Sequence, residues 1–303
     1  MADALDPGHL IGHVKDAEYF ELPRTLVEGG KLHLPQFRPA EEPVYQLQTG
    51  VEMLDSLVEP LDLRLTKFMV LEVVAAVLVA TLFIWLAGRL SSGRAPRGRL
   101  WNLLEAMLLF LRNEVARPAI GKHDADRFLP FLWTVFFFIL ACNLLGMVPW
   151  MGSPTGALGA TGALALVTFG VVVGSGTAKM GVVGFWTSQV PHMKLPLVLA
   201  IFLIPMIFAI EVLGLCIKHF VLSVRLLANM MAGHLVLAVL VAFVAAVGAT
   251  VSSYFDPLFL GVSMASILGA TALSLLELFV AFLQAYIFTF LSALFIGMAV
   301  HPH

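Results

Sequence analysis

The stretch EVLGLCIKHFVLSVRLLANMMAGH, residues 211–234, sets acidic, basic and amide side chains in a run that is otherwise apolar enough for lipid. A charge at bilayer depth is costly, so it normally faces protein or water and normally has a function. On one continuous helix, Glu211, Lys218 and Arg225 recur at i, i+7 and i+14 and share a face. His234 points to nearly the opposite side, so the helix presents polar groups to two neighbours.

The composition of the whole chain predicts an all-α polytopic membrane protein. Of its 303 residues 59% are hydrophobic and only 13% are charged, with a mean hydropathy of +0.92, whereas about 25% of the residues of soluble proteins are charged. Cys142 and Cys216 both lie in apolar runs, which indicates neither a disulfide framework nor a cysteine metal site. We expect no metal, no cofactor, no catalytic residue and no nucleic-acid partner.

The chain divides into a polar arm, residues 1–66, and a membrane domain, residues 67–303. The arm carries twelve acidic, five basic and six proline residues, which predicts a loosely structured segment with one short helix near residues 50–58. The N-terminus lacks the basic and apolar regions of a cleavable signal, so the first span, residues 68–87, must itself direct insertion. Basic loops stay cytoplasmic, so the arginines after this span place the arm outside: Arg89, Arg94, Arg97 and Arg99.

The middle of the chain predicts a surface helix and two further spans. Residues 101–117 mix apolar with charged side chains between basic loops, which is typical of an amphipathic helix on the cytoplasmic surface; the alternatives are a short soluble-type helix or a poor span. Spans follow at residues 129–148 and 157–177, each of about the 20 residues that cross ~30 Å of hydrocarbon. Gly170 and Gly174, at small-xxx-small spacing, predict close helix contact.

The last two apolar runs are too long to stand upright in a membrane. Residues 197–247 continue for about 50 residues, which is ~75 Å as one helix, and residues 258–300 follow after a turn. The first run is either two short spans with a turn near Lys218 and His219, or one helix, bent near Pro205 and steeply tilted. Two consecutive over-long runs favour a strongly tilted hairpin. The count then gives about five crossings, an outer N-terminus and a cytoplasmic C-terminus.

Folding these runs as an antiparallel hairpin brings polar groups to matching depths. Glu277 and Gln284 share one face of the second run. Counted from a turn near residue 253, Gln284 lies about as deep as Arg225, Glu277 lies near His234 on the outer side, and Glu211 lies nearer the cytoplasm. His and Glu can relay protons at accessible pH, whereas Arg keeps its charge. The arrangement therefore favours proton movement, with the arginine as a barrier between two groups of carriers.

Plainer interpretations stay open at this point. Arg225 also fits a static ion pair between helices, and Lys218 and His219 fit snorkelling or the lining of a bend. Asn229 and Gln284 equally fit hydrogen bonds that hold membrane helices together. The convergence of polar groups onto two helices at matching depths favours the functional interpretation.

Three segments and one spacing resemble subunit a of the F-type ATP synthase. VRLLANMMAGH contains the arginine, NLLGMVP at 143–149 is similar to the NL-x-x-LLP segment of that family, and LQAYIF at 283–288 is similar to its LQAFIF. Glu211 stands fourteen residues before the arginine, as in the family. The likeness runs along residues 68–300, with Gly146 where some members carry an aspartate, and the polar arm adds no support.

The resemblance implies a non-catalytic, proton-conducting stator subunit in a bacterial inner membrane. Its implied partners are the c-ring, the peripheral stalk of subunit b, membrane lipid and, indirectly, the F1 head. Arg225 would face the ring, and His234 with Glu277 would form the outer half-channel pair, in the reverse order to many bacterial members. The residues implicated in proton translocation are Arg225, His234, Glu277, Gln284, Asn229 and Glu211, and the candidates for lining the inner channel are Lys218 and His219.

Two other classes of protein remain as alternatives. A stand-alone ion-coupled transporter or channel would have its own substrate site and would work without partners. An intramembrane protease needs a metal or nucleophile motif, and neither HExxH nor GxSxG occurs in the sequence. The sequence leaves open whether H⁺ or Na⁺ is the coupling ion, because in the resembled family the c subunit makes that choice.

Overall fold

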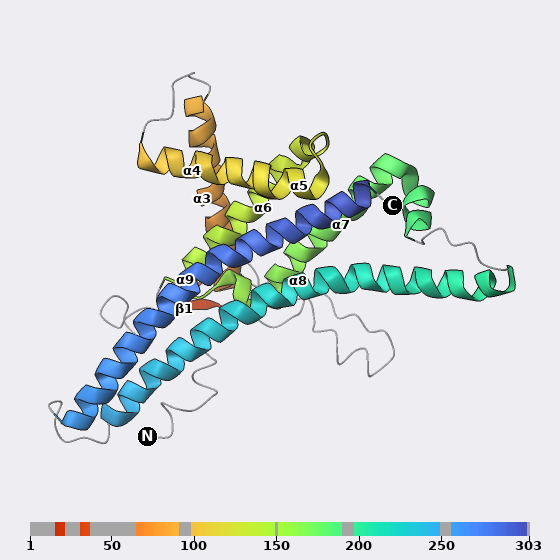
Figure 1. Ribbon diagram of the computed structural model, residues 1–303. Helices are drawn as coiled ribbons and strands as arrows, with labels where there is room; N and C mark the ends of the chain where they lie inside the picture. Colours follow the sequence, from red (N-terminus) through yellow and green to blue (C-terminus); the bar gives the residue numbers. More distant parts are fainter. Residues whose placement is uncertain are drawn as a thin grey trace.

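The fold is built mainly from long helices, as Figure 1 shows. The computed structural model describes residues 16–21, 31–36, 65–90, 98–148, 151–189, 197–248 and 256–301. Its elements are β1 (Tyr19–Glu21), β2 (Lys31–His33), α3 (Lys67–Leu90), α4 (Arg99–Phe110), η2 (Leu111–Ala116), α5 (Arg117–Ile120), α6 (Ala125–Gly146), η3 (Pro154–Gly156), α7 (Leu158–Ser188), α8 (Leu197–Gly248) and α9 (Pro257–Val300). Five of these, α3, α6, α7, α8 and α9, are long and apolar enough to cross a membrane, which confirms the predicted all-α polytopic fold. The short helix expected near residues 50–58 lies outside the described residues.

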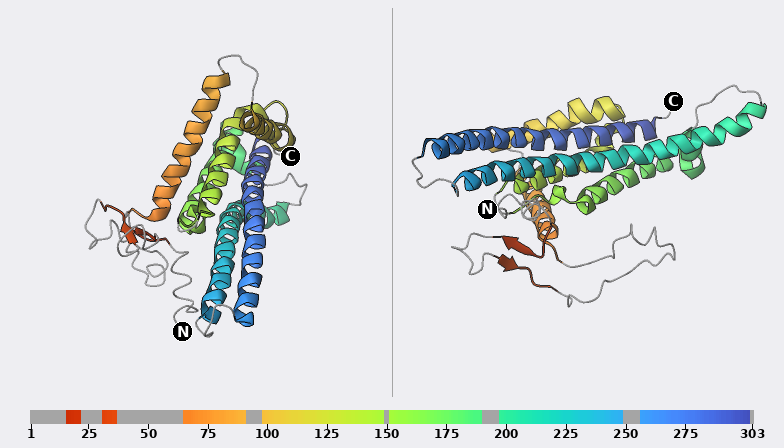
Figure 2. Two further views of the ribbon diagram at one scale, coloured as in Figure 1. Left: turned by 90° about the vertical axis from the view of Figure 1, so that its left-hand side faces the viewer. Right: turned by 90° about the horizontal axis from the view of Figure 1, so that it is seen from below.

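The last two helices form a long antiparallel hairpin. α8 is one helix of 52 residues, about 78 Å long, and it runs through Lys218 and His219 without a turn and through Pro205 without a break in the helix. α9 has 44 residues and lies beside it (Figures 1 and 2). Both helices are far longer than the roughly 20 residues of an upright span, so tilt keeps their apolar length inside the membrane.

The buried core lies around the C-terminal half of α9. This half packs against α5, α6 and α7, and α3 packs against the other side of α6. Leu132 and Ile139 of α6 and Phe288 and Ile296 of α9 are each no more than 2% exposed. By contrast α8 is apolar but largely exposed: most of its buried side chains lie in its middle, and its C-terminal half packs against α9.

The segment predicted as a surface helix runs across α3 and α6, as Figure 1 shows. It begins as α4, continues as the π-helix η2 and ends as α5. Trp101 packs its ring edge-on against Trp85 of α3, and Trp133 of α6 donates its indole N–H to the carbonyl oxygen of Leu108. Every few residues a side chain is buried against the helix bundle, so one face of this segment is held by the protein: Trp101, Leu104, Leu111, Val115 and Ile120.

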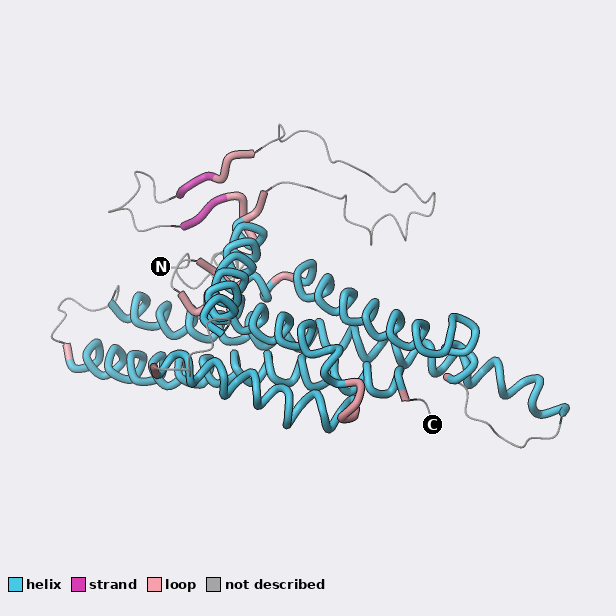
Figure 3. The backbone as a smooth tube through the Cα atoms, turned by 90° about the horizontal axis from the view of Figure 1, so that it is seen from above, coloured by secondary structure: helices cyan, strands magenta, loops and turns pink. Residues whose placement is uncertain are grey.

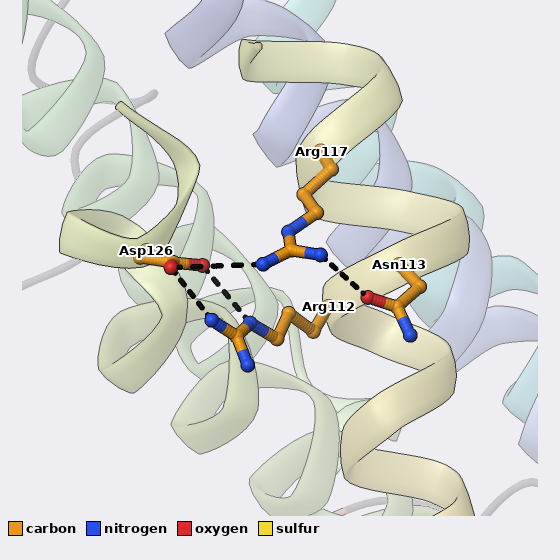
Figure 4. A network of polar contacts seen from close by, with 4 residues as sticks. All are labelled: Arg112, Asn113, Arg117 and Asp126. Carbon is orange, nitrogen blue, oxygen red and sulfur yellow. Dashed lines mark hydrogen bonds and ion pairs between the residues drawn. The ribbon is translucent and has the colours of Figure 1, made fainter. Parts of the chain in front are cut away.

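An arginine fork joins η2 to the first turn of α6 (Figure 4). Arg112 donates from Nε and Nη2 to the two carboxylate oxygens of Asp126 at 3.0 and 2.7 Å. Arg117 lies 3.8 Å from the same carboxylate and also donates to Asn113. These groups are partly exposed, so the contact contributes geometry more than stability.

Part of the polar arm is ordered as a two-stranded antiparallel sheet at the N-terminal end of α3, as Figure 3 shows. Tyr19 pairs with His33, and Phe20 with Leu32. Asp16 accepts a hydrogen bond from the free N–H of Phe68 at 3.2 Å, which is a capping contact for α3. The prediction of a loosely structured arm is therefore wrong for these strands, whose three residues each were too few to show a pattern.

α7 bends back on itself at Gly181, whose φ of +79° lies outside the range of a helix. After the bend, Phe185 packs its ring directly against Gly176, where a side chain would overlap it. Gly170 and Gly174, in contrast, are exposed, and a Cβ at either position would meet no described atom within 4 Å. The prediction that these two glycines mediate close contact is wrong; Gly176, off that register, does so.

We predict that Gly297→Ala destabilises the protein by about 1–3 kcal/mol. A Cβ at Gly297 would overlap the carbonyl oxygen of Ala119, so α9 would have to move away from α5. Gly214→Ala is the matched control, because its Cβ would meet nothing and the change should be neutral or stabilising by up to about 1 kcal/mol. Unfolding in mixed micelles, followed by circular dichroism, measures both, and equal effects would contradict the packing described.

Candidate functional site

α8 carries Arg225 on a face that the rest of the described chain leaves largely open. Arg225 and Asn229 are partly buried, whereas Glu211 and Lys218 on the same face are exposed. Neither the Arg225 guanidinium nor the Asn229 amide makes a hydrogen bond or an ion pair with any residue that the structure describes. A guanidinium keeps its charge and requires an acceptor, so Arg225 is available to a group from elsewhere.

The structure brings His234 of α8 and Glu277 of α9 together. Nδ1 of His234 lies 3.7 Å from Oε1 of Glu277, and the two side chains are 18% and 7% exposed. This distance is beyond a direct hydrogen bond, and His234 Nε2 and Glu277 Oε1 have no hydrogen-bond partner in the described part of the chain. Gly233 permits the approach, because a Cβ there would lie 2.7 Å from Glu277 Oε1. The pair is a buried acid and base with spare hydrogen-bonding capacity, which suits the uptake and transfer of a proton.

Gln284 is buried, but its side-chain amide has no hydrogen-bond partner among the described residues. It is 5% exposed and lies seven residues after Glu277, on the same side of α9. Its amide makes no hydrogen bond with any residue in the described ranges. An amide with unused donors and acceptors can bind a polar group or a water molecule.

Lys218 and His219 lie in different environments although they are adjacent in the chain. Lys218 is exposed, whereas His219 is 4% exposed. The ring centroid of His219 lies 5.2 Å from that of Phe169 on α7 and 5.0 Å from that of Phe295 on α9. Its Nδ1 lies 2.9 Å from the carbonyl oxygen of Leu215, and Nε2 has no partner among the described residues. The structure therefore packs His219 into the bundle and does not bring the two side chains to one surface.

A buried chain of hydrogen bonds joins α6, η3 and α9 next to the acid-base pair. Asn143 donates from Nδ2 to the carbonyl oxygen of Ala281, which lies one turn after Glu277. Thr155 donates to Asn143 Oδ1 at 2.9 Å and lies 2.8 Å from the hydroxyl of Ser153. Sequence reasoning missed this chain. Ser153 and Thr155 stand in a glycine- and proline-containing turn, where serine and threonine are ordinary, so only Asn143 carried a signal.

A second buried link fixes α8 beside the arginine. Ser223 donates from Oγ to Oγ1 of Thr161 on α7 at 3.0 Å, and both residues are no more than 2% exposed. Ser223 is two residues before Arg225, so this bond fixes the local position of α8 against α7.

The site offers proton transfer and hydrogen bonding as its chemistry. Among the residues that the structure describes, no three His, Cys, Asp or Glu side chains are grouped so that they could hold a metal ion. Cys142 is buried and Cys216 is exposed, each as a free thiol.

The family model and the similar proteins all indicate the same family. The model of the family described as ATP synthase A chain matches residues 69–297. The chain is 47% identical over 177 residues to a protein of Myxococcus xanthus named ATP synthase subunit a, and 42% identical over 179 residues to one of the same name from Anaeromyxobacter dehalogenans. It is 38% identical over 235 residues to ATP synthase subunit a 2 of Chlorobaculum tepidum.

These matches cover much of this chain but less of the relatives. They span 58%, 58% and 76% of this chain, and 56%, 45% and 58% of the three relatives in the same order. The chain thus spans about half the length of the relatives that it matches.

We predict that Thr155→Val destabilises the fold by about 1–3 kcal/mol, because it leaves the buried Asn143 Oδ1 without its donor. Thr271→Val is the matched control: its hydroxyl is exposed and donates only to the carbonyl oxygen of Ile267 in its own helix. Chemical unfolding of both variants in the same micelles gives the comparison. A Thr155→Val protein as stable as the Thr271→Val protein would show that the buried chain does not hold α6 to α9.

Proposed function

Because the chain belongs to the ATP synthase A chain family, we propose that it is the proton-conducting stator subunit of a rotary ATP synthase. In this role it forms two half-channels, each open to one side of the membrane only. They exchange protons with a carboxylate on a neighbouring ring of c subunits. The chain itself performs no chemistry on ATP, which is made in the F1 head of the complex.

The observation that carries this proposal is the unpaired guanidinium of Arg225. The two glutamates of the hairpin are unsuitable as its counter-charge, because Glu277 lies against His234 and Glu211 is exposed fourteen residues before Arg225. A carboxylate on another chain supplies the missing charge. The face of α8 beyond Arg225 supports this, since its exposed side chains are small or apolar and allow a second helix to approach: Ala228, Ala232 and Val236.

The outer half-channel ends at His234 and Glu277. Their exposed fractions are low but not zero, and each keeps an unused hydrogen-bonding atom, so they can accept a proton from water and pass it on. The proton then moves to the ring carboxylate. The reversed order of histidine and acid relative to many members leaves this chemistry unchanged, because either residue can hold the proton while the other stabilises it.

The inner half-channel leads past Glu211 to the cytoplasm. Glu211 and Lys218 lie on the same exposed face as Arg225, so a carboxylate that has passed the arginine meets this side next. Arg225 separates the two half-channels, because its fixed charge repels a free proton and favours an ionised carboxylate beside it. The buried His219 contributes to the wall of this half through packing.

A ring is needed because one proton releases too little energy. One charge crossing 100 mV is worth about 2.3 kcal/mol, so several must be accumulated for one ATP. In the same proposal, the ring contacts the open face of the α8–α9 hairpin, and a peripheral stalk of subunit b holds the chain still. The polar arm lies outside, and the C-terminus lies in the cytoplasm. The loop rich in arginine after α3 supports this orientation in a bacterial inner membrane.

We predict that Arg225→Ala abolishes ATP-driven acidification of inverted membrane vesicles, because protons can then cross without turning the ring. Arg99→Ala is the matched control, since Arg99 is exposed and its side chain makes no hydrogen bond or ion pair with any described residue. The signal of Arg225→Ala should fall to that of vesicles treated with a protonophore. Undiminished pumping, or purification of the chain without a c-ring, would overturn the assignment and favour a transporter that works alone.

Exchanging the members of the outer pair provides a separate test. His234→Glu alone places two carboxylates side by side, and Glu277→His alone places two imidazoles there, so each single variant should lose most proton flux. The double variant restores one acid and one base and should recover flux above both single variants. Flux in both single variants equal to that of the unchanged chain would show that the pair does not carry protons, whatever the role of Arg225.

A further inference from the structure

A cavity of about 590 Å³ lies away from the polar site, where α6 begins, α7 approaches its bend and α9 ends. Its polar mouth is formed by Asp124, Arg127 and Lys179. Its walls are apolar or small: Phe128, Val171, Gly174, Ala178 and Val300 line them. The cavity therefore has both charged and apolar lining residues, and it lies at the start of the membrane-span candidate α6 and at the end of the candidate α9.

The side chains at the mouth carry a net positive charge. Among the described residues that line the cavity, Asp124 is the only carboxylate, and it accepts a hydrogen bond from Lys179 at 2.8 Å. His301 and His123 lie 3.3 and 3.5 Å from the same carboxylate. The hydrogen bond from Lys179 holds the pKa of Asp124 below its usual range, so the carboxylate stays ionised and remains bonded to Lys179. The Arg127 side chain is exposed at the mouth, and its guanidinium has no ion pair or hydrogen bond with any described residue.

Lys179 can still bind an anion beside Arg127. An ammonium group has three donors, and Asp124 takes one of them. Arginine and lysine directed at one opening form a site for a phosphate, and basic pockets between membrane helices bind lipid head groups. A free phosphate ion would satisfy the two cations but leave the apolar walls facing water.

The apolar walls have room for a chain. Gly174 lies on α7 with no described atom within 4 Å of the position of its Cβ, and Phe128 and Val171 line the same space from two helices. An acyl chain fills these walls with van der Waals contacts, and its polar end then lies at the charged mouth. The combination selects an amphiphile with an anionic head.

We propose that this cavity binds one anionic phospholipid, with its phosphate between Arg127 and Lys179 and an acyl chain along Phe128 and Val171. The site joins the start of α6 to the end of α7 through the lipid, beside the ion pairs that already hold the end of α9. It stands independently of proton conduction, because none of its residues belongs to the proposed half-channels.

The test uses the full chain in detergent micelles, titrated with phosphatidylglycerol or with phosphatidylcholine of the same acyl chains, and native mass spectrometry to count bound lipid. We expect a preference for phosphatidylglycerol on the order of tenfold, because both lipids carry the phosphate but Arg127 and Lys179 repel the choline cation of phosphatidylcholine. Arg127→Gln should remove this preference. Gly174→Phe should fill the cavity and weaken binding of both lipids.

Two matched controls separate the site from general effects. Lys122→Gln removes an exposed charge near α6 that does not line the cavity, and Gly170→Phe adds the same ring one turn away on α7, where it meets no described atom. Both should bind lipid as the unchanged chain does. Circular dichroism and gel filtration identify any variant that has lost its fold.

Three results would overturn the proposal. One is equal retention of phosphatidylglycerol by the unchanged chain and by a folded Arg127→Gln variant. Another is unchanged lipid binding in folded Gly174→Phe. The third is displacement of the lipid by inorganic phosphate at equal concentration, which would identify a site for a soluble anion.

Discussion

A guanidinium keeps its charge at any accessible pH, and in an apolar environment that charge requires an acceptor. Arg225 has none among the described residues, while Ser223, two residues earlier, is bonded to α7. The backbone beside the charge is thus fixed and the charge itself is left open. A chain that only needed a stable bundle would pair or remove the arginine, so its unpaired state among the described residues supports the proposal that another chain supplies its partner.

The acid-base pair resembles Arg225 in this respect: the backbone nearby is held by a hydrogen bond, while side-chain atoms of the pair have no partner. Asn143 holds α9 through the carbonyl oxygen of Ala281, one turn from Glu277, and Gly233 lets the carboxylate approach α8. The carboxylate and the imidazole of His234 keep atoms without partners. Buried polar atoms are normally satisfied, and unsatisfied ones are costly, so the neighbouring hydrogen-bonded chain carries the stability that this pair does not.

The sequence predicted much of the fold, because hydropathy and length report directly on membrane spans. Residues 197–247 could form two short spans or one helix, and the structure has one helix. Ser223 and His219 pack this helix against α7, and no local sequence pattern predicts such a tertiary contact. Matching depths along a hairpin brought His234 to Glu277, since helical rise is regular. The same regularity gave a wrong prediction of close contact at Gly170 and Gly174. The close contact lies instead at Gly176, because the bend of α7 at Gly181 turns Phe185 onto it. The strands of the arm pair across a gap in sequence, so short-range reasoning had no access to them.

The position of the pair follows from where the packing of α9 changes. From Ala281 onward α9 is buried by α5, α6 and α7, whereas before Glu277 most of its side chains are exposed. Glu277 stands at this boundary. There the absence of a side chain at Gly233 lets the carboxylate approach α8, and its Oε1 has no hydrogen-bond partner in the described part of the chain. The change in packing along α9 therefore supports the proposal that Glu277 takes up and releases a proton.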